Sequence, residues 1–379
     1  MDLSFIAHLG ERPGPFATVY LDATHDAADA AHRSELRWAA AREDLAAQGA
    51  DGATLDAVAA AVEDAPPAQG RAGRVLVATD GAVVLDRVLA APPAPAVASG
   101  ALAVWGPVPD LLPMLLAMPE PVLALVVRVD ETGGEILRVP PGGAPETVEH
   151  VSGRQHPVHK VSTGGPSDRN VQEHVEETWR RNTAEVAERV DAHVRAHPTG
   201  VLLLAGDAPA RSRLRDALSA RAAALAVDLE HSGGPDDVDD LAAAVAVAVD
   251  DVSGRERFAA LERYREAAGR GEGFGVEGVD AVLAALRAEQ VDTLLLDGSV
   301  TRDGAVFVAA GSPTQLAGDP ETLRAEGAEP YGPAGVDAAM IRAAAAGGVT
   351  VHAIADDQPE LGLADGVAAV LRYPFVGTS

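Results

Sequence analysis

The chain has 379 residues and no cysteine, and its 30 lysines and arginines stand against 57 acidic residues, which gives a net charge of −27. A chain without cysteine has no disulfides, thiol nucleophiles, iron–sulfur clusters or cysteine-ligated zinc. Its negative charge repels polyanions and argues against free DNA or RNA binding. No window approaches the roughly 18 apolar residues of a membrane span, and residues 1–15 lack the pattern of a signal peptide. We therefore expect a cytoplasmic protein that binds neither membranes nor DNA.

Apolar periodicity and turn signals divide the chain into three α/β segments. We expect these to be an N-terminal α/β domain at 1–120, a middle domain at 121–253 and a C-terminal domain at 254–379. The first segment is predicted to contain a strand at 17–21, helices at 31–48 and 54–63, a hairpin of 74–79 with 82–89, and a short helix or turn at 111–118.

The other two segments repeat the mixture of buried strands and amphipathic helices. The middle segment is predicted to contain strands at 122–129, 135–139 and 200–206, a loop at 142–170, and helices at 171–197 and 210–224. The last segment is predicted to contain helices at 255–268, 279–287 and 336–346, strands at 291–296 and 349–354, and a closing segment at 366–373.

Several polar clusters are candidate metal or phosphate sites, but each has a simpler explanation. His193 and His197 lie one helical turn apart with Asp191 nearby, yet the sequence places no further ligand, so a polar helix end is favoured. Aspartate pairs are explained by helix caps and solvated surface; they lie at 236–237, 239–240, 250–251 and 356–357. The glycine-rich stretch 269–275 follows a helix instead of a strand, which favours a link between domains over a phosphate cradle. No P-loop occurs. We therefore predict no metal and no cofactor.

The loop around residues 150–172 stands out electrostatically. It contains three basic residues, Arg154, Lys160 and Arg169, and one acidic residue, Asp168. The loop therefore has a net charge of +2 in a chain of −27. His150, His156 and His159 add partial positive charge. The loop also contains Gly164-Gly165-Pro166, in which two glycines permit close approach to another surface. An ordinary solvated loop and a loop that faces a polyanion both fit this pattern.

In this order, these residues resemble the archaeo-eukaryotic release factor and Pelota superfamily. Thr-Gly-Gly-Pro-Ser at 163–167 and Arg-Arg-Asn at 180–182 stand where that family has its GGQ loop and the following helix. Residues 275–279, 284–286 and 291–295 resemble the start of its C-terminal domain, and 362–373 resembles its terminal GGIxAxLRY motif. Residues 14–20 and 157–160 are similar to the actinobacterial branch, which is related to the hibernation factor Balon and to Vms1/ANKZF1-type proteins. The resemblance implies an RNase H-like middle domain and a ribosomal-L7Ae-like C-terminal domain.

The departures from the family are informative. The catalytic glutamine of GGQ is Pro166 here, which has no amide to orient a water molecule, so we expect no catalytic residue. Gln155 is the nearby candidate for a replacement, outside the matched position. The stop-codon motifs NIKS and YxCxxxF are also absent, since Lys160 is the sole lysine and there is no cysteine.

The resemblance then implies a protein that docks in the ribosomal A site without peptide release, as a hibernation or stress factor, with rRNA and ribosomal proteins as partners and EF-Tu as a possible carrier. The implied contact residues are Arg154, His156, His159, Lys160, Gly164, Gly165, Pro166 and Arg169. One alternative is a peptidyl-tRNA hydrolase or rescue factor of the Vms1/ANKZF1 type that uses Gln155. Another is an acidic interaction module that never meets the ribosome.

Overall fold

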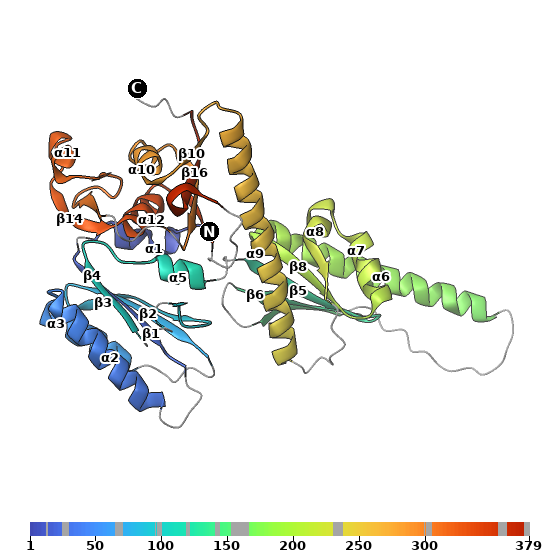
Figure 1. Cartoon of the computed structure of the whole chain (residues 1–379). Helices are drawn as coiled ribbons and strands as arrows, with labels where there is room; N and C mark the ends of the chain where they lie inside the picture. The colour runs from blue at the N-terminus through green and yellow to red at the C-terminus, as the bar shows by residue number, and fades with distance from the viewer. Residues whose placement is uncertain are drawn as a thin grey trace. The chain divides into compact units, whose positions relative to one another are not determined.

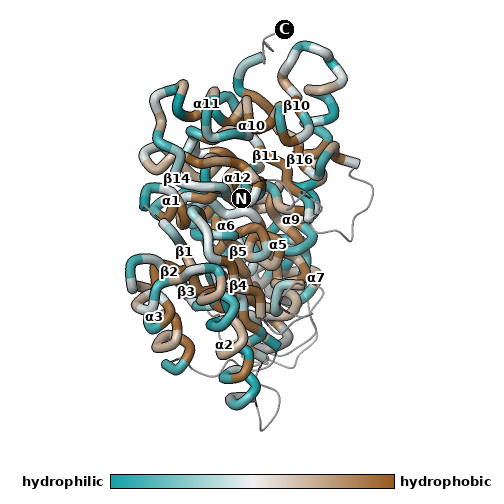
Figure 2. The backbone as a smooth tube through the Cα atoms, turned by 60° about the vertical axis from the view of Figure 1, so that its left-hand side comes forward, coloured by the Kyte–Doolittle hydropathy of each residue, from teal (hydrophilic) through white to brown (hydrophobic). Residues whose placement is uncertain are grey.

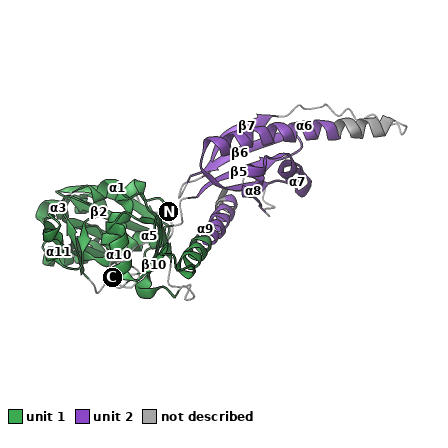
Figure 3. Ribbon diagram, turned by 90° about the horizontal axis from the view of Figure 1, so that it is seen from above, with its two compact units in different colours: residues 1–118, 257–379 green, residues 119–256 purple. Residues whose placement is uncertain are grey.

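The computed structural model describes residues 1–12, 14–24, 30–64, 71–94, 96, 101–118, 122–140, 145–152, 167–229, 238–298, 300, 305–354 and 362–374; within these, the side chains of 30–31, 167–175, 238–240 and 242 are left out. The chain forms two compact units (Figure 3). Unit 1 combines residues 1–118 with 257–379, and unit 2 contains 119–256. Both units are built from sheets covered by helices, as the α/β prediction requires.

The N-terminal part of unit 1 is an antiparallel sheet of order β3-β2-β1-β4. Its strands are β1 (Phe16–Asp22), β2 (Gly73–Thr79), β3 (Ala82–Leu89) and β4 (Ala101–Gly106). Alternate residues of β1 face opposite sides, and Val19 packs under helices α2 (Ala30–Ala47) and α3 (Gly52–Glu63). Tyr20 faces the other side and joins the main core of the unit. Figure 1 shows α2 and α3 along one side of this sheet.

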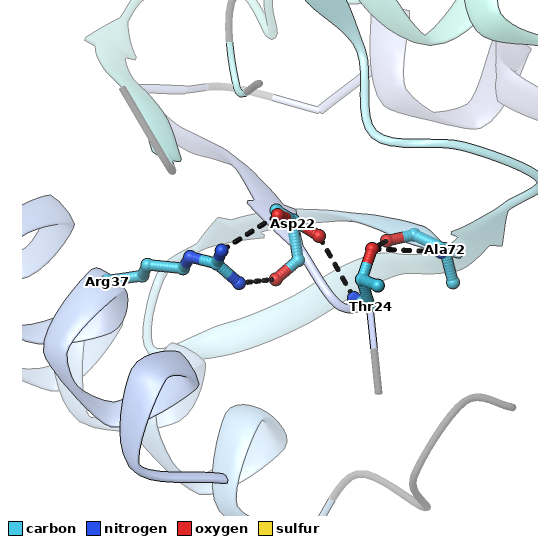
Figure 4. A network of polar contacts seen from close by, with 4 residues as sticks. All are labelled: Asp22, Thr24, Arg37 and Ala72. Carbon is cyan, nitrogen blue, oxygen red and sulfur yellow. Dashed lines mark hydrogen bonds and ion pairs between the residues drawn. The ribbon is translucent and has the colours of Figure 1, made fainter. Parts of the chain in front are cut away.

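A polar network fixes the end of β1 to α2 (Figure 4). Arg37 of α2 donates to the backbone oxygen of Asp22 at 2.7 Å and to its carboxylate at 2.8 Å. Thr24 donates its backbone N–H to the same carboxylate, and its hydroxyl lies within 3.4 Å of the backbone of Ala72. Burial alone would raise the pKa of Asp22, but the Thr24 hydrogen bonds and the charges of Arg37 and Arg33 outweigh it and lower this pKa.

The outer edge of β4 is occupied by a side chain. Gln48, just after α2, donates its amide to the backbone oxygen of Ala103 at 3.1 Å. The backbone N–H of Trp105 donates to the oxygen of the same amide at 2.8 Å. The Gln48 amide therefore satisfies two backbone groups that a neighbouring strand would otherwise pair.

The C-terminal part of unit 1 contains a sheet of order β10-β16-β11-β15 and a smaller one of order β13-β12-β14. The first sheet consists of β10 (Gly275–Glu277), β11 (Val291–Asp297), β15 (Thr350–Ile354) and β16 (Val367–Leu371). The second consists of β12 (Ala305–Ala309), β13 (Leu316–Ala317) and β14 (Pro330–Gly335). The helices are α10 (Val279–Arg287), α11 (Pro320–Ala325) and α12 (Val336–Ala346).

Helix α12 lies at the centre of the main core of unit 1. Its residues are buried from Val336 to Ala345, and Figure 2 colours α12 largely as apolar. The helix α1 (Ser4–Gly10) packs against it, and α5 (Leu112–Ala117) contributes to the same core. Because residues from both ends of the chain share this core, the first and last segments fold as one compact unit. The division into three domains in release-factor order stays a prediction.

Unit 2 is a five-stranded mixed sheet of order β7-β6-β5-β8-β9. The strands are β5 (Leu123–Val129), β6 (Gly133–Val139), β7 (Glu146–Ser152), β8 (Thr199–Ala205) and β9 (Ala226–Asp228). One face packs against α6 (Ser167–Ala196), α7 (Ala208–Ala217) and α8 (Ala220–Leu225), and the other against the first part of α9 (Val238–Gly269). Neighbouring residues of β5 alternate between the two cores, since Val127 faces the α6 side and Val126 the α9 side.

Three expectations for the middle of the chain are corrected. The predicted loop at 142–170 contains the edge strand β7 and the first turn of α6. The predicted helix at 210–224 is two helices, because the hydroxyl of Ser219 starts a new helix by accepting from the N–H of Ala222. The helix predicted from 255 begins at Val238, so the predicted boundary at 254 lies inside α9.

The glycine-rich stretch 269–275 is a turn inside unit 1 that joins α9 to β10. Gly271 and Gly273 have positive φ angles of 65° and 78°. A Cβ atom at Gly275 would lie 2.6 Å from the backbone nitrogen of Ala268. These glycines close a tight turn, so the expected link between domains is wrong.

Candidate functional site

The loop predicted to make the functional contacts connects β7 to α6 in unit 2. Ser152, the last residue of β7, is paired with Gly133 of β6, and Ser167 begins α6. Seven of the predicted contact residues lie outside the described residues: Arg154, His156, His159, Lys160, Gly164, Gly165 and Pro166. Arg169 lies in α6, but its side chain is outside the description. The described part of the site is therefore the framework that holds the two ends of this loop.

Helix α6 is anchored to the sheet over its second half. Val186, Val190 and Val194 are at most 1% exposed and pack on Leu125, Val127 and Ile136. Each buried valine contributes about 1.5 kcal/mol or more through the hydrophobic effect. The buried amide of Asn182 adds a hydrogen bond of 3.2 Å to the backbone oxygen of Glu131, in the turn between β5 and β6.

The first half of α6 extends past this anchored part. Among the described side chains of α6, Asn182 is the first that is buried, and positions 176–181 are exposed or half-buried. Thirty residues at 1.5 Å each give a helix of about 45 Å. Figure 1 shows α6 reaching beyond the strands of the sheet. The fold thus supports a long helix at one end and leaves its N-terminal half, which follows the loop, without core contacts among the described residues.

A carboxylate of β7 joins this strand to α6. Glu149 lies 3.0 Å from Nε2 of His193 and 3.5 Å from Nε of Arg189. Pairs exposed to this extent contribute about 0–1 kcal/mol, so they orient β7 and α6 while the valines supply most of the stability.

Two of the candidate metal ligands on α6 contact different residues outside the helix. His193 contacts Glu149, while the carboxylate of Asp191 accepts the hydroxyl of Ser219 at 2.7 Å. The rings of His193 and His197 are stacked with centroids 6.3 Å apart. Within the described ranges, no three or more His, Asp or Glu side chains are grouped to hold a metal ion. The aspartates at 236–237 and 356–357, and the side chains of 239–240, lie outside the description.

The opposite face of the sheet carries a second polar cluster near the start of the loop. Arg128 of β5 lies 3.2 Å from Glu135 of β6, and the hydroxyl of Thr147 in β7 donates to the same carboxylate at 2.7 Å. His150 lies 3.9 Å from Glu135. These contacts hold β7 in register up to its last residues, so both faces of the strand that leads into the loop are fixed.

The C-terminal motif at 362–373 has a structural role. Asp365 has a positive φ angle of 54°, and its carboxylate accepts the N–H of Val279 at 3.2 Å. The residue before α10, Gly278, has no side chain to cap the helix. Asp365 therefore supplies the N-terminal cap of α10 from 86 residues further along the chain.

Sequence reasoning missed the arginines of α7. Arg211, Arg213 and Arg215 alternate along the helix, and Arg213 stacks on Trp179 of α6 at 5.3 Å from the ring centroid. The alternation of basic residues in 211–215 is the signal that was available.

Comparison with known proteins identifies the family. Residues 124–270 match the model of bacterial archaeo-eukaryotic release factor family 2. The uncharacterized protein Rv2629 of Mycobacterium tuberculosis (strain ATCC 25618 / H37Rv) is 31% identical over 384 residues, which cover 95% of this chain and 94% of that protein. This chain and Rv2629 belong to one family, and the matched segment of the chain is release-factor-like. The family match includes all of α6 and the loop before it.

Solved structures of release-factor-like proteins are similar to this family member at low identity. The crystal structure of the archaeal translation termination factor aRF1 is 14% identical, covers 97% of this chain and 96% of that chain, and has a TM-score of 0.25. Archaeoglobus fulgidus Pelota is 15% identical, covers 80% of each chain, and has a TM-score of 0.36. The model of ribosome-bound archaeal Pelota and ABCE1 is 12% identical, covers 98% of this chain and 93% of that chain, and has a TM-score of 0.40.

None of the helices in the described part of this release-factor-like chain is long and apolar enough to span a membrane.

Proposed function

We propose that this protein binds the ribosome in its A site without releasing the peptide, and that it acts as a hibernation or stress factor when translation is idle. The proposal rests on Pro166, which the sequence resemblance puts where release factors have their hydrolytic glutamine, within the segment that matches the family model. The family supports a role in translation, and the missing amide removes the chemistry of peptide release. In this proposal the protein occupies the A site and does not cleave the peptidyl-tRNA ester.

The framework of unit 2 supports this role physically. The segment 153–166 follows an edge strand that pairs with β6 as far as Ser152, and it precedes a helix with a buried second half. Its surroundings in the sequence carry a net charge of +2 through Arg154, Lys160, Arg169 and Asp168. A cationic loop in an acidic protein favours contact with ribosomal RNA at that loop. The acidic remainder of the protein complements basic ribosomal proteins.

Co-sedimentation with vacant ribosomes tests the docking. We expect the full chain to pellet with ribosomes at low salt, and reversal of Arg154, Lys160 and Arg169 to glutamate to weaken this binding about 100-fold or more, since three phosphate contacts are lost. The matched control reverses three exposed arginines of unit 1, which are Arg263 and Arg265 on α9 and Arg270 just after it. If both triple variants bind equally, the loop is not the contact.

A peptide-release assay on stalled ribosomes separates docking from hydrolysis. We expect no release above background, because proline has no side-chain amide. Ester cleavage that disappears in a Gln155→Ala variant would replace our proposal with the peptidyl-tRNA hydrolase alternative. Delivery by EF-Tu is part of the same proposal, and a pull-down with EF-Tu in its GTP form tests it, since absence of binding excludes this carrier.

A further inference from the structure

A second cationic region lies in unit 2, outside the loop. Residues 208–225, which span α7 and α8, contain four arginines and one aspartate, a net charge of +3 in a chain of −27. Contacts within the fold or an anionic ligand can neutralise this charge. The question is which of these arginines are already used by the fold.

Two of the four arginines attach α7 to the edge strand β9. Arg211 donates to the backbone oxygen of Leu229 at 2.7 Å. Arg215 donates to the backbone oxygen of Ala226 at 3.0 Å and to the carboxylate of Asp228 at 2.9 Å. These guanidinium groups complete the packing of α7 on the sheet and are not available to a ligand.

Arg213 is held in a different way. Its guanidinium carbon lies 5.3 Å from the centroid of the half-buried Trp179 ring, and its Nε is buried without a hydrogen-bond partner. Among the described contacts Arg213 makes no ion pair with a carboxylate, although Asp216 follows it by three residues. An aromatic ring orients a guanidinium without neutralising its charge, so Arg213 is oriented and still cationic.

Arg221, in the first turn of α8, is the fourth arginine. Its side chain is exposed, and no ion pair or hydrogen bond holds it among the described residues. Helix α8 is attached to α6 through Ser219, which donates to Asp191. Both short helices that carry the two uncompensated arginines therefore pack on α6, the helix that follows the proposed docking loop (Figure 1).

We propose that Arg213 and Arg221, the α7–α8 patch, bind phosphate groups of RNA, with Trp179 as the positioning residue for Arg213. Arginine next to an aromatic ring is a common combination on RNA-binding surfaces. Protein interfaces usually centre on apolar side chains, and the exposed large apolar residues of the described chain all lie elsewhere: Leu36, Val88, Val247, Phe258 and Tyr373. The inference rests on the proposed function, in which the ribosome supplies the RNA.

The test measures the affinity of the full chain for vacant ribosomes over a series of salt concentrations. Each phosphate contact that is lost lowers the slope of log K against log salt by about 0.7–0.9. We expect Arg213→Gln and Arg221→Gln each to weaken binding about three- to tenfold at low salt and to reduce the slope by this amount. The control is Arg270→Gln, which removes the same charge from an exposed arginine paired with Glu266 on α9; it should change neither quantity.

Two further variants separate binding from folding. Arg213→Lys keeps the charge and is expected to keep the slope. Arg221→Gln changes an exposed side chain, so it remains informative if Arg213→Gln lowers the melting temperature. Trp179→Leu should weaken binding in the parent protein but have no further effect in the Arg213→Gln background, as a positioning role requires.

The outcomes distinguish this inference from the proposed function. If the parent chain does not bind ribosomes, the proposed function fails. If it binds, but folded Arg213→Gln and Arg221→Gln variants keep its affinity and slope, the proposed function stands and the α7–α8 patch is overturned. If affinity falls while the slope stays unchanged, the patch contacts something other than phosphate, such as a ribosomal protein, and the RNA assignment is overturned.

Discussion

Helices α6 and α9 are similar in length, 30 and 32 residues, but they are buried in different ways. Among the described side chains of α6, the buried ones lie in its second half, and the buried valines belong to one core. The buried residues of α9 belong to two cores: Leu241 and Val245 face the sheet of unit 2, while Leu261 and Tyr264 face the sheet of unit 1. The length of a helix alone therefore does not indicate which cores it joins.

The two patterns of burial give the two long helices different roles in the fold. In α6, burial at one end supports a helix whose other end carries the proposed docking loop. In α9, burial at both ends makes one helix a component of two cores, and Ser253-Gly254 lies between them. Four predictions break or sharpen this comparison.

The largest effect is expected from shortening the buried leucines of α9. Leu241→Ala and Leu261→Ala should each lower the free energy of unfolding by about 2–5 kcal/mol, because each leaves a cavity in a core. Leu241→Ala should act on unit 2, which contains Trp179, and Leu261→Ala on unit 1, which contains Trp38 and Trp105. Denaturation followed by fluorescence of single-tryptophan variants reads each unit separately. Equal shifts of one common transition in both variants would break the comparison.

The next effect concerns the point where burial of α6 begins. Asn182→Ala should cost about 1–3 kcal/mol, since it leaves the backbone oxygen of Glu131 without this hydrogen bond. Arg181→Ala, one residue earlier and exposed, should change the stability by less than about 0.5 kcal/mol. Urea denaturation compares the two. A similar cost for both would show that α6 is anchored over more of its length.

A smaller effect, with a pH signature, is expected in the unit 1 half of α9. Burial of Tyr264, then its hydrogen bond of 2.8 Å to Glu277 and the charge of that carboxylate, raise the pKa of this tyrosine. A raised pKa contributes stability that is complete below the ordinary value of about 10 and is lost as pH rises above it.

Tyr264→Phe should therefore cost about 1 kcal/mol near neutral pH and lose less stability than the parent protein between about pH 10 and pH 11. Unfolding free energies of both proteins at several pH values check this. Parallel profiles would mean that Tyr264 has the same pKa in the folded and unfolded chains.

The smallest effect is stabilising. A Cβ atom added to Gly254 meets nothing within 4 Å, and the residue lies inside the continuous helix α9. Gly254→Ala should raise the free energy of unfolding by about 0.5–1 kcal/mol, since alanine loses less conformational freedom in a helix. A melting temperature that falls in this variant would indicate that the backbone at Gly254 needs glycine.

The fold was predictable where the signals are local. The helices α10 and α12 have the predicted bounds, and the strands β1, β2 and β3 differ from their predictions by at most one residue at either end, because apolar periodicity and flanking Gly or Asp residues mark them. Strand β7 was missed because Val151 is its one fully buried residue, and its charged side chains are paired with partners on β6 and α6. The start of α9 was missed because the alternating Ala and Val of 243–249 fit a strand and a helix equally.

The candidate site also has features that the sequence predicts and features that it does not predict. The charge and the glycine motif of the loop are visible in the sequence, and the prediction of its contacts stays untested by the described residues. The framework was not predictable, because Asn182 contacts a residue 51 positions away and His193 one that is 44 positions away. The cap of α10 by Asp365 is a further example, since the sequence alone suggests a terminal motif but not its partner.

Gln48 gives the N-terminal sheet a property that a search for binding sites would overlook. An unpaired edge strand can pair with a strand of a second copy of the protein, which leads to self-association and, in the extreme, to fibril growth. Here one amide takes the place of the incoming strand at Ala103 and Trp105. A second molecule must displace it before it can extend the sheet, so a single glutamine next to α2 opposes strand addition at this edge.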